Sequence, residues 1–351
     1  MKEEFQFFST LSLLTIWACI VVYAESGSVF RLKSGHNMPV IGLGTHGIND
    51  KLLEDVLEAS LEKGLRFIDT GYHYGNEASI GKVLKNWFGK GGKREDIFVS
   101  SKLPYYDMQP SEVEQYIKSS LEKLGLQYLD MYLIHAPFSG IRKKDSYALV
   151  TDENGNVLHG TNDPVAIWKE MEKQVKAGRT RSIGLSNFNE TQISKIISEA
   201  EIKPSNLQIE VHLYHQQVPL REFCQKHGIL VTAYAPLGSH EARKAFHPEQ
   251  SEIEFPNPLK HSNISEIAKG NGKSTAQILL RHLVQNGHVV IPGSKKPNHI
   301  ADNLKILDFE LPDEEMEVMN SLDKGDRGKV FDYKFLKGIE KHPQYPWSNR
   351  A

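Results

Sequence analysis

Short apolar runs recur along the chain between glycine-rich or polar stretches. Runs of about four or five residues with such boundaries are typical of strands that a parallel sheet buries on both faces. The sequence therefore predicts eight strands, at residues 42–45, 66–69, 97–101, 131–134, 182–185, 206–209, 230–233 and 289–291.

The stretches between these runs repeat apolar residues every three or four positions, which predicts amphipathic helices. The clearest start is at Asp163, an N-cap residue that Pro164 follows at the first helical position. We expect eight helices, near residues 51–63, 76–88, 111–123, 164–177, 190–199, 219–226, 274–286 and 297–306.

Strict alternation of strand and helix predicts an α/β fold, specifically a (β/α)8 TIM barrel. An open doubly wound sheet is the alternative. That fold carries a glycine-rich phosphate turn after its first strand, and Gly42-Leu43-Gly44-Thr45 lacks the required spacing. The alternation therefore favours the barrel.

Three further segments add to this barrel. Residues 29–33 and 38–41 flank a polar turn at 34–37, which predicts an N-terminal β-hairpin. Residues 136–163 and the tail after about residue 323 are too long to be barrel turns. Long loops after barrel strands build active sites, so we expect both segments near the functional site.

The N-terminus differs from the rest of the chain. Residues 7–22 carry no charge, and Val22-Tyr23-Ala24 resembles a cleavage site. The run is short for a membrane span and suits a signal peptide over residues 1–24. Residues 25–351 then form a single domain, secreted or held in the endoplasmic reticulum lumen. The alternative is an uncleaved segment that anchors the protein to a membrane.

A secretory route has consequences for two asparagines and two cysteines. Asn189 and Asn263 begin glycosylation tripeptides, and each is otherwise a plain surface asparagine. Cleavage removes Cys19 and leaves Cys224 as the one thiol, so no internal disulfide can form. This cysteine usage is unusual for a secreted protein.

Charge and histidine spacing exclude other classes of function. Lysines and arginines number 42 against 44 acidic residues, a net charge of −2. This balance gives no electrostatic reason to expect a nucleic-acid partner. The 15 histidines show no metal-ligand spacing, so we expect no metal site.

Polar residues stand where several predicted strands end. Asp69, Lys102 and His135 each close or follow a strand, and Tyr74 lies shortly after the first of them. Carboxyl ends of barrel strands converge at one face, so these side chains are expected to meet. An ammonium group near a phenol favours the phenolate and lowers the phenol's pKa. The set therefore predicts a proton donor, Tyr74, for a carbonyl that becomes an alcohol.

Longer motifs resemble one family. They are GLRFIDTGYHYGNE, FVSSKLP, LDMYLIHAP, RSIGLSNFN, VTAYAPLG and IPGSKKPNHIADN, with DENGN and HPQYPW in the loop and tail. In order and spacing they resemble the aldo-keto reductases over roughly residues 29–347. The resemblance implies a barrel enzyme that moves hydride between a nicotinamide cofactor and a small-molecule carbonyl substrate, as a monomer.

The resemblance also implies roles for individual residues. Asp69, Tyr74, Lys102 and His135 match the family's catalytic positions, with Tyr74 as the proton donor and His135 orienting the carbonyl. Matches to cofactor-binding positions are Thr45, Asp69, Ser186, Asn187, Gln208, Tyr234, Leu237, Ser239, Ser294 and Asn303. Among these, Ser186, Asn187 and Gln208 match the carboxamide contacts, and Tyr234 matches the ring that stacks on nicotinamide.

Other positions depart from the family pattern. Gly293 and His299 stand where relatives that prefer NADPH usually carry cations, so NADH remains the alternative to NADPH, and Lys295 and Lys296 are candidates for compensation. In the substrate pocket, His46, His73 and Ala136 replace larger or more apolar residues, which predicts a wider, more polar pocket. The altered cofactor site also keeps open a catalytically weak nicotinamide-binding protein with a regulatory or interaction role.

Overall fold

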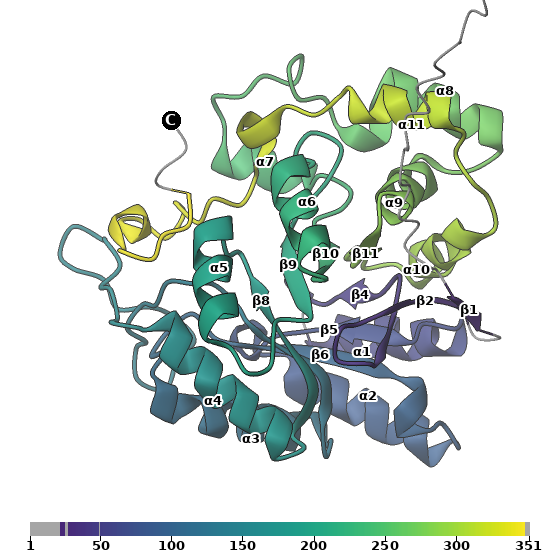
Figure 1. Cartoon of the computed structure of the whole chain (residues 1–351). Helices are drawn as coiled ribbons and strands as arrows, with labels where there is room; N and C mark the ends of the chain where they lie inside the picture. The colour runs from purple at the N-terminus through teal and green to yellow at the C-terminus, as the bar shows by residue number, and fades with distance from the viewer. Residues whose placement is uncertain (1–21, 25–26, 49, 348–351) are drawn as a thin grey trace, which may run out of the picture.

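Eight short strands, almost entirely buried, form the centre of the molecule (Figure 1). The computed structural model describes residues 22–24, 27–48 and 50–347. Each strand pairs in parallel with the next one along the chain. In sheet order the strands are β4 (Leu43–Gly44), β5 (Phe67–Asp69), β6 (Phe98–Leu103), β7 (Leu129–Ile134), β8 (Thr180–Ser186), β9 (Asn206–Glu210), β10 (Leu230–Tyr234) and β11 (His288–Val290).

The first and last strands of this sheet also meet. Ile41, just before β4, forms a parallel bridge with Val290 of β11. The Gly42 N–H donates to the Val290 carbonyl at 2.9 Å, and the Val290 N–H donates to the Val40 carbonyl at 2.9 Å. These bonds join the two edges, which confirms the (β/α)8 barrel and excludes the open doubly wound sheet.

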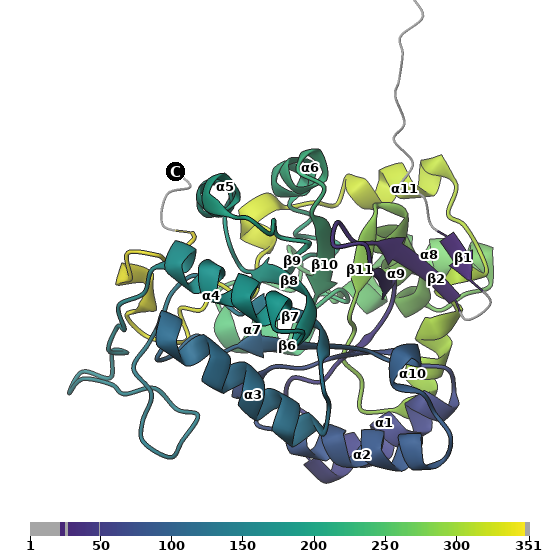
Figure 2. The same ribbon diagram turned by 60° about the horizontal axis from the view of Figure 1, so that its bottom comes forward.

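Helices lie on the outside of the strands, and α1, α2 and α3 run side by side along one flank (Figure 2). The N-cap prediction for α4 is correct, because the Asp163 carboxylate accepts from the Val165 N–H at 2.9 Å. Eight helices match the predicted positions: α1 (Asp50–Glu62), α2 (Glu77–Gly89), α3 (Val113–Leu124), α4 (Pro164–Lys176), α5 (Glu190–Glu199), α6 (Val218–Lys226), α9 (Thr275–Gln285) and α10 (Pro297–Asn303).

Three helices were not predicted from the pattern: α7 (His240–Phe246), α8 (Ser262–Asn271) and α11 (Asp313–Asn320). Each is short, and α11 buries only Met319. Together with α9, α8 and α11 enclose a second, smaller apolar cluster that includes Ile264, Ile278 and Met319. This packing stabilises α8 and α11, and a local pattern does not reveal it.

The predicted N-terminal hairpin is present as β2 (Gly27–Arg31) and β3 (Asn37–Pro39), paired antiparallel with Phe30 opposite Met38. A further strand, β1 (Val22–Ala24), pairs with β2 at the end of the predicted signal peptide. Residues 1–21 lie outside the described residues, so cleavage and anchoring both stay predictions. The turn of the hairpin contacts the start of β8, where the Ser34 and Ser182 hydroxyls are 2.7 Å apart.

The two long segments pack against each other beside the barrel mouth. The Val157 N–H donates to the Lys337 carbonyl at 2.8 Å, and His159 Nε2 contacts the Gly338 carbonyl at 2.9 Å. The tail therefore folds back over the carboxyl ends of the strands, as the sequence predicted. Figure 1 shows it in yellow beside the teal loop.

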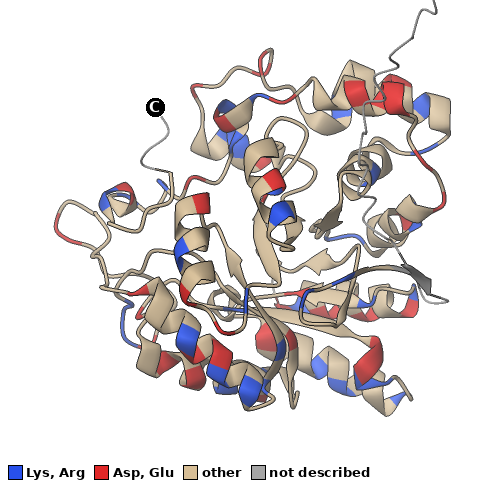
Figure 3. Cartoon of the chain, viewed as in Figure 1, with Lys and Arg blue, Asp and Glu red and all other residues tan. Residues whose placement is uncertain are grey.

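Charged residues of both signs are interspersed along the outer helices in the view of Figure 3. Among the described residues, we find no helix of the length and apolarity that crossing a membrane requires.

Candidate active site

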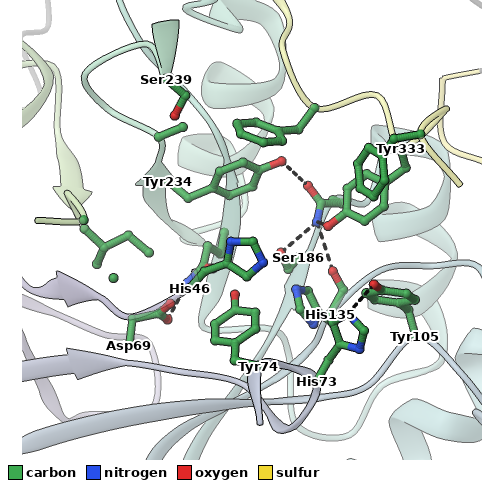
Figure 4. A pocket seen from close by; sticks show the side chains of 18 of the residues that line it. His46, Asp69, His73, Tyr74, Tyr105, His135, Ser186, Tyr234, Ser239 and Tyr333 are labelled. Atoms are coloured by element: carbon green, nitrogen blue, oxygen red, sulfur yellow. Dashed lines mark hydrogen bonds between the residues drawn. The ribbon is translucent and has the colours of Figure 1, made fainter. Parts of the chain in front are cut away.

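A cavity of about 350 Å³ opens at the carboxyl ends of the strands (Figure 4). Its volume lies within the usual range for sites that bind small molecules. The predicted residues that line it are His46, Asp69, His73, Tyr74, His135, Ser186, Asn187, Gln208, Tyr234 and Ser239. The barrel therefore brings together side chains from six of its strands and the loops that follow them.

A buried ion pair lies at the base of this cavity. Lys102 Nζ is 2.7 Å from Asp69 Oδ2, and both side chains are almost inaccessible to water. Lys102 Nζ also donates to the Thr70 carbonyl at 2.7 Å. The other carboxylate oxygen, Asp69 Oδ1, accepts from Ser100 Oγ at 2.6 Å and from Gln208 Nε2 at 2.8 Å. Burial lowers the pKa of Lys102, and Asp69 opposes this and favours the ammonium form.

Tyr74 lies beside this pair. Lys102 Nζ is 4.9 Å from the centre of its ring, and the ring of His46 contacts it edge-on with 4.8 Å between centres. Burial, with a smaller contribution from Asp69, raises the pKa of Tyr74 well above 10. The expected lowering by Lys102 is therefore wrong for this resting state. Lys102 is already hydrogen-bonded to Asp69 and Thr70, and desolvation of the phenol dominates.

His135 is the second polar group facing Tyr74, with 5.6 Å between ring centres. Burial, then the charge of Lys102 and the neighbouring His73 and His46, lowers its pKa well below 6.5. The imidazole is therefore neutral near pH 7. Its buried Nδ1 has no hydrogen-bond partner in the described structure. A neutral ring with unused hydrogen-bonding capacity suits contact with a substrate oxygen.

Asn187 connects the opposite side of the cavity. Tyr234 Oη donates to its Oδ1 at 2.9 Å. Its Nδ2 donates to the His135 carbonyl at 3.0 Å, Ser186 Oγ at 3.1 Å and Tyr333 Oη at 3.2 Å. The backbone of Asn187 has a φ of 62°, a left-handed conformation that asparagine tolerates better than most residues. The amide is thus held by groups from three strands and the tail.

The cavity contains a second contact between titratable groups. Tyr105 Oη is 2.7 Å from His73 Nε2, and burial lowers the pKa of His73 to about 4. His73 Nδ1 is buried without a partner among the described residues. Ala136, by contrast, is fully buried and does not line the cavity, so its role in a wider pocket stays a prediction.

Sequence reasoning missed five aromatic residues of the lining. The missed residues are Tyr105, Phe246, Phe331, Tyr333 and Phe335. Tyr105 comes two residues after the end of β6, so the rule that found Lys102 would also have found it. The three tail residues carried only a general signal, the expectation that the tail lies near the site.

Comparisons with known proteins agree with this geometry. The profile of the aldo/keto reductase family matches residues 40–324, most of the chain. The chain belongs to the aldo/keto reductase family. Aldo-keto reductase family 1 member A1 of Xenopus tropicalis is 39% identical over 326 residues, covering 91% of this chain and 97% of that protein.

Other relatives of this aldo-keto reductase have different names. Prostaglandin F synthase 1 of Bos taurus is 36% identical over 324 residues, covering 91% of this chain and 97% of that protein. The solved structure of aldose reductase from Schistosoma japonicum matches with a TM-score of 0.82 and 37% identity, covering 92% of this chain and 99% of that one. The chain is therefore an oxidoreductase of a family that uses NAD(P)H on small carbonyl compounds.

The residues around the cavity of this aldo-keto reductase fit a nicotinamide. Ser186, Asn187 and Gln208 offer uncharged donors and acceptors on one side, and Tyr234 offers an aromatic ring. Figure 4 shows Tyr234 and Ser239 across the cavity from Tyr74 and His73. A flat ring complements an aromatic face, and amide groups complement a carboxamide.

Four predicted cofactor residues lie outside the cavity lining. Thr45 is fully buried, and its hydroxyl donates to the Asp69 carbonyl at 3.0 Å. Leu237 packs between the two apolar clusters. Ser294 Oγ accepts from the Lys296 N–H at 3.1 Å, and Asn303 ends α10. The last two lie along the segment after β11, so their roles stay predictions.

Acidic residues, histidines and cysteines do not gather into a metal-binding group. Within the part of the chain that the structure describes, no three of them lie close enough to hold an ion.

Proposed function

We propose that this aldo-keto reductase reduces aldehydes or ketones to alcohols, with Tyr74 as the proton donor and NADPH as the hydride source. The observation that carries the proposal is the buried Asp69–Lys102 pair beside Tyr74 and His135 at one cavity. A reduced nicotinamide, when bound, supplies a hydride to the carbonyl carbon.

Side chains of the protein orient the carbonyl group and protonate its oxygen. Neutral His135 orients the carbonyl by a hydrogen bond from its ring. As negative charge develops on the oxygen, the Tyr74 O–H donates its proton to that oxygen. The resulting phenolate is stabilised by the ammonium of Lys102, whose charge acts in a region without water. Asp69 and the Thr70 carbonyl keep that ammonium in place.

Replacing Tyr74 by Phe tests this assignment. Loss of a positioned general acid typically costs about 10²–10⁴-fold in rate, so reduction of 4-nitrobenzaldehyde should fall by that factor. Cofactor binding, followed by quenching of protein fluorescence, should change little. Retained reduction would refute Tyr74 as the proton donor. Binding without turnover in the unmodified chain would instead support the weakly catalytic nicotinamide-binding protein.

The proposed preference for NADPH over NADH rests on the charged residues in the segment after β11. Gly293 and His299 supply no permanent cation for a 2′-phosphate, whereas the exposed Lys295 and Lys296 lie in the same segment. Hydrogen bonds to charged groups contribute about 1.5–3 kcal/mol, so replacing both lysines by Ala should weaken NADPH binding and leave NADH binding unchanged. Equal effects on the two cofactors would contradict a phosphate-binding role.

The substrate is proposed to be a polar carbonyl compound. His46 and His73 line the cavity, and Tyr105 adds a hydroxyl beside them. Such groups complement substrates that carry hydroxyls next to the carbonyl. Turnover measured across aldoses, steroids and aromatic aldehydes tests this choice, and reaction of the apolar carbonyls alone would exclude it.

Secretion is proposed from residues 1–24 and carries a prediction about glycosylation. Asn189 caps α5, accepting from the Gln192 N–H at 2.9 Å, and its Nδ2 donates to the Pro346 carbonyl at 3.0 Å. A glycan on that nitrogen would displace the tail, which favours Asn263 as the acceptor. A mobility shift on glycosidase treatment that Asn263→Gln abolishes would support this choice, and a shift that persists would not.

A further inference from the structure

We propose that Glu210 is a positioning residue, which holds the C-terminal tail in place so that the tail forms one wall of the active-site cavity. The inference rests on the proposed carbonyl reduction for its kinetic consequence only. Glu210 ends β9, does not line the cavity and has no role in the proton transfer.

The carboxylate of Glu210 is buried, and each of its two oxygens accepts a hydrogen bond from the tail backbone. Only 1% of the residue is exposed. Its Oε1 accepts from the Val330 N–H at 2.6 Å and is 2.9 Å from His212 Nε2. Its Oε2 accepts from the Phe331 N–H at 2.8 Å. Although burial alone would raise the pKa of Glu210, its contacts with His212 and the nearby His215 and Lys329 hold that pKa at about 2.

A second contact holds the same stretch of tail. His215 Nε2 is 2.9 Å from Lys329 Nζ, and His215 Nδ1 is 2.8 Å from the Gly325 carbonyl. Between these points the tail backbone touches the turn after β9. A Cβ added at Gly328 would lie 1.7 Å from the Tyr214 carbonyl oxygen, so only glycine fits there. We call Glu210, His212, His215 and Lys329 the tail clamp.

The helix α7 and the residue after it form hydrogen bonds with the opposite side of this stretch. Arg243, in α7, donates from Nη2 to the Gly328 carbonyl. His247, at the end of α7, places Nε2 3.0 Å from the Val330 carbonyl. The tail therefore passes between the turn after β9 and α7, and is hydrogen-bonded to both.

Directly after the clamped stretch, the tail enters the cavity. Phe331, whose N–H donates to Glu210, packs its ring edge-on against Tyr234 with 5.9 Å between centres. Tyr333 contacts Asn187 Nδ2 through its hydroxyl at 3.2 Å. Phe335 stacks on Phe246 of α7 with 5.1 Å between centres. The clamp thus determines where the three lining residues Phe331, Tyr333 and Phe335 lie. One of them, Tyr333, is also a hydrogen-bond partner of the Asn187 amide.

Loss of the clamp should therefore weaken binding and spare chemistry. The proton-transfer groups lie on β5 and β6 and just after β5 and β7, whereas Glu210 ends β9. An interaction that holds substrate and transition state equally affects KM and leaves kcat unchanged. We expect KM for the carbonyl substrate to rise and binding of the nicotinamide by Asn187 to weaken.

The chain provides a matched control in Glu172. This glutamate is equally buried, with 3% exposed, and its Oε1 also accepts from two backbone N–H groups, those of Glu201 at 2.7 Å and Ile202 at 3.0 Å. It joins α4 to the segment after α5, away from the tail. Glu210→Ala and Glu172→Ala therefore remove the same kind of bond at two different places.

The experiment compares both variants of the full chain with the unmodified protein, by steady-state kinetics with 4-nitrobenzaldehyde and by trypsin cleavage. For Glu210→Ala we expect the carbonyl KM to rise at least about tenfold with kcat within about threefold. Cleavage after the exposed Lys334 and Lys337 should accelerate at least about tenfold, because local opening exposes that backbone. Glu172→Ala should leave both quantities within about twofold.

Two outcomes would overturn the proposal: unchanged KM and tail cleavage in a folded Glu210→Ala, or equal changes in Glu172→Ala. If Glu210→Ala does not fold, Glu210→Gln answers the same question, because it keeps the shape and one acceptor and should show a smaller change in the same direction. If the unmodified chain shows no turnover, the proposed function fails, and tail cleavage still tests the clamp.

Discussion

The two ends of the barrel each contain a carboxylate paired with a cation at 2.7 Å, and the surroundings of the two pairs differ. At the mouth, Asp69 pairs with Lys102, whose side chain is 0% exposed. At the opposite end, Asp130 near the start of β7 pairs with Arg94 at 2.7 Å and with Arg181 at 3.3 Å. Arg181 is 38% exposed, and both guanidinium groups lie 4.0 Å from the ring centre of Tyr128.

This comparison shows how the same ionic chemistry serves two purposes. The distal group reaches solvent through Arg181 and is stacked on a ring, so water partly screens its charges and the contact mainly joins β7 to its neighbours. The pair at the mouth is shielded from solvent by burial and lies beside a phenol and an imidazole. Its charges therefore act on Tyr74 and His135, the groups proposed to meet the substrate.

Removing the cation at the mouth should have the largest effect. In Lys102→Met, Asp69 remains as a buried, uncompensated charge, which typically costs about 3–5 kcal/mol of unfolding free energy. Reduction should also fall about 10²-fold or more, because the phenolate of Tyr74 loses its stabilising charge. Urea unfolding and steady-state kinetics measure the two effects, and full stability would contradict the proposed cost of leaving Asp69 without its partner.

Acid should destabilise the protein through histidines at both ends. Burial lowers the pKa of His282, in α9 away from the mouth, to about 4, whereas the unfolded side chain takes up a proton near pH 6.5. The unfolded state binds more protons between these values, so the stabilisation is complete above pH 6.5 and is lost as the pH falls towards 4.

For one such histidine the loss between pH 7 and pH 5 should be roughly 1–2 kcal/mol. His282→Gln should reduce the pH dependence of the unfolding free energy, measured by urea denaturation, by that amount. His73→Gln provides the matching measurement at the mouth, where burial also lowers the pKa to about 4. An unchanged pH dependence in both variants would show that neither histidine is buried in its neutral form.

Replacing the distal cation should have the smallest effect. Arg181→Met removes a partly exposed partner at 3.3 Å while Arg94 remains on Asp130, so we expect a loss of about 0–1 kcal/mol. The kcat and KM for carbonyl reduction should stay at their original values. A kinetic effect comparable with that of Lys102→Met would contradict the separation of the two ends.

Much of the barrel and the grouping of its strand-end polar residues was predictable, because both follow from local order. Asp69, Lys102 and His135 each mark a strand end, and parallel strands bring such ends to one face. The aromatic residues that the tail contributes to the cavity lining were not predictable in the same way. Phe331 and Tyr333 lie about 200 residues or more along the chain from His73 and His135, and their position depends on contacts made by Glu210 and α7.

Local patterning along the chain is sufficient for the strand–helix alternation, the hairpin and the grouping of the strand-end residues, because side-chain periodicity records which face of an element is buried. The protonation states of the buried residues, and the part of the cavity lining that comes from the tail, depend on distances between residues far apart in the sequence. Lys102 was expected to lower the pKa of Tyr74, yet burial and, to a smaller extent, the charge of Asp69 raise it. Desolvation is a property of the folded environment, and no local pattern encodes it.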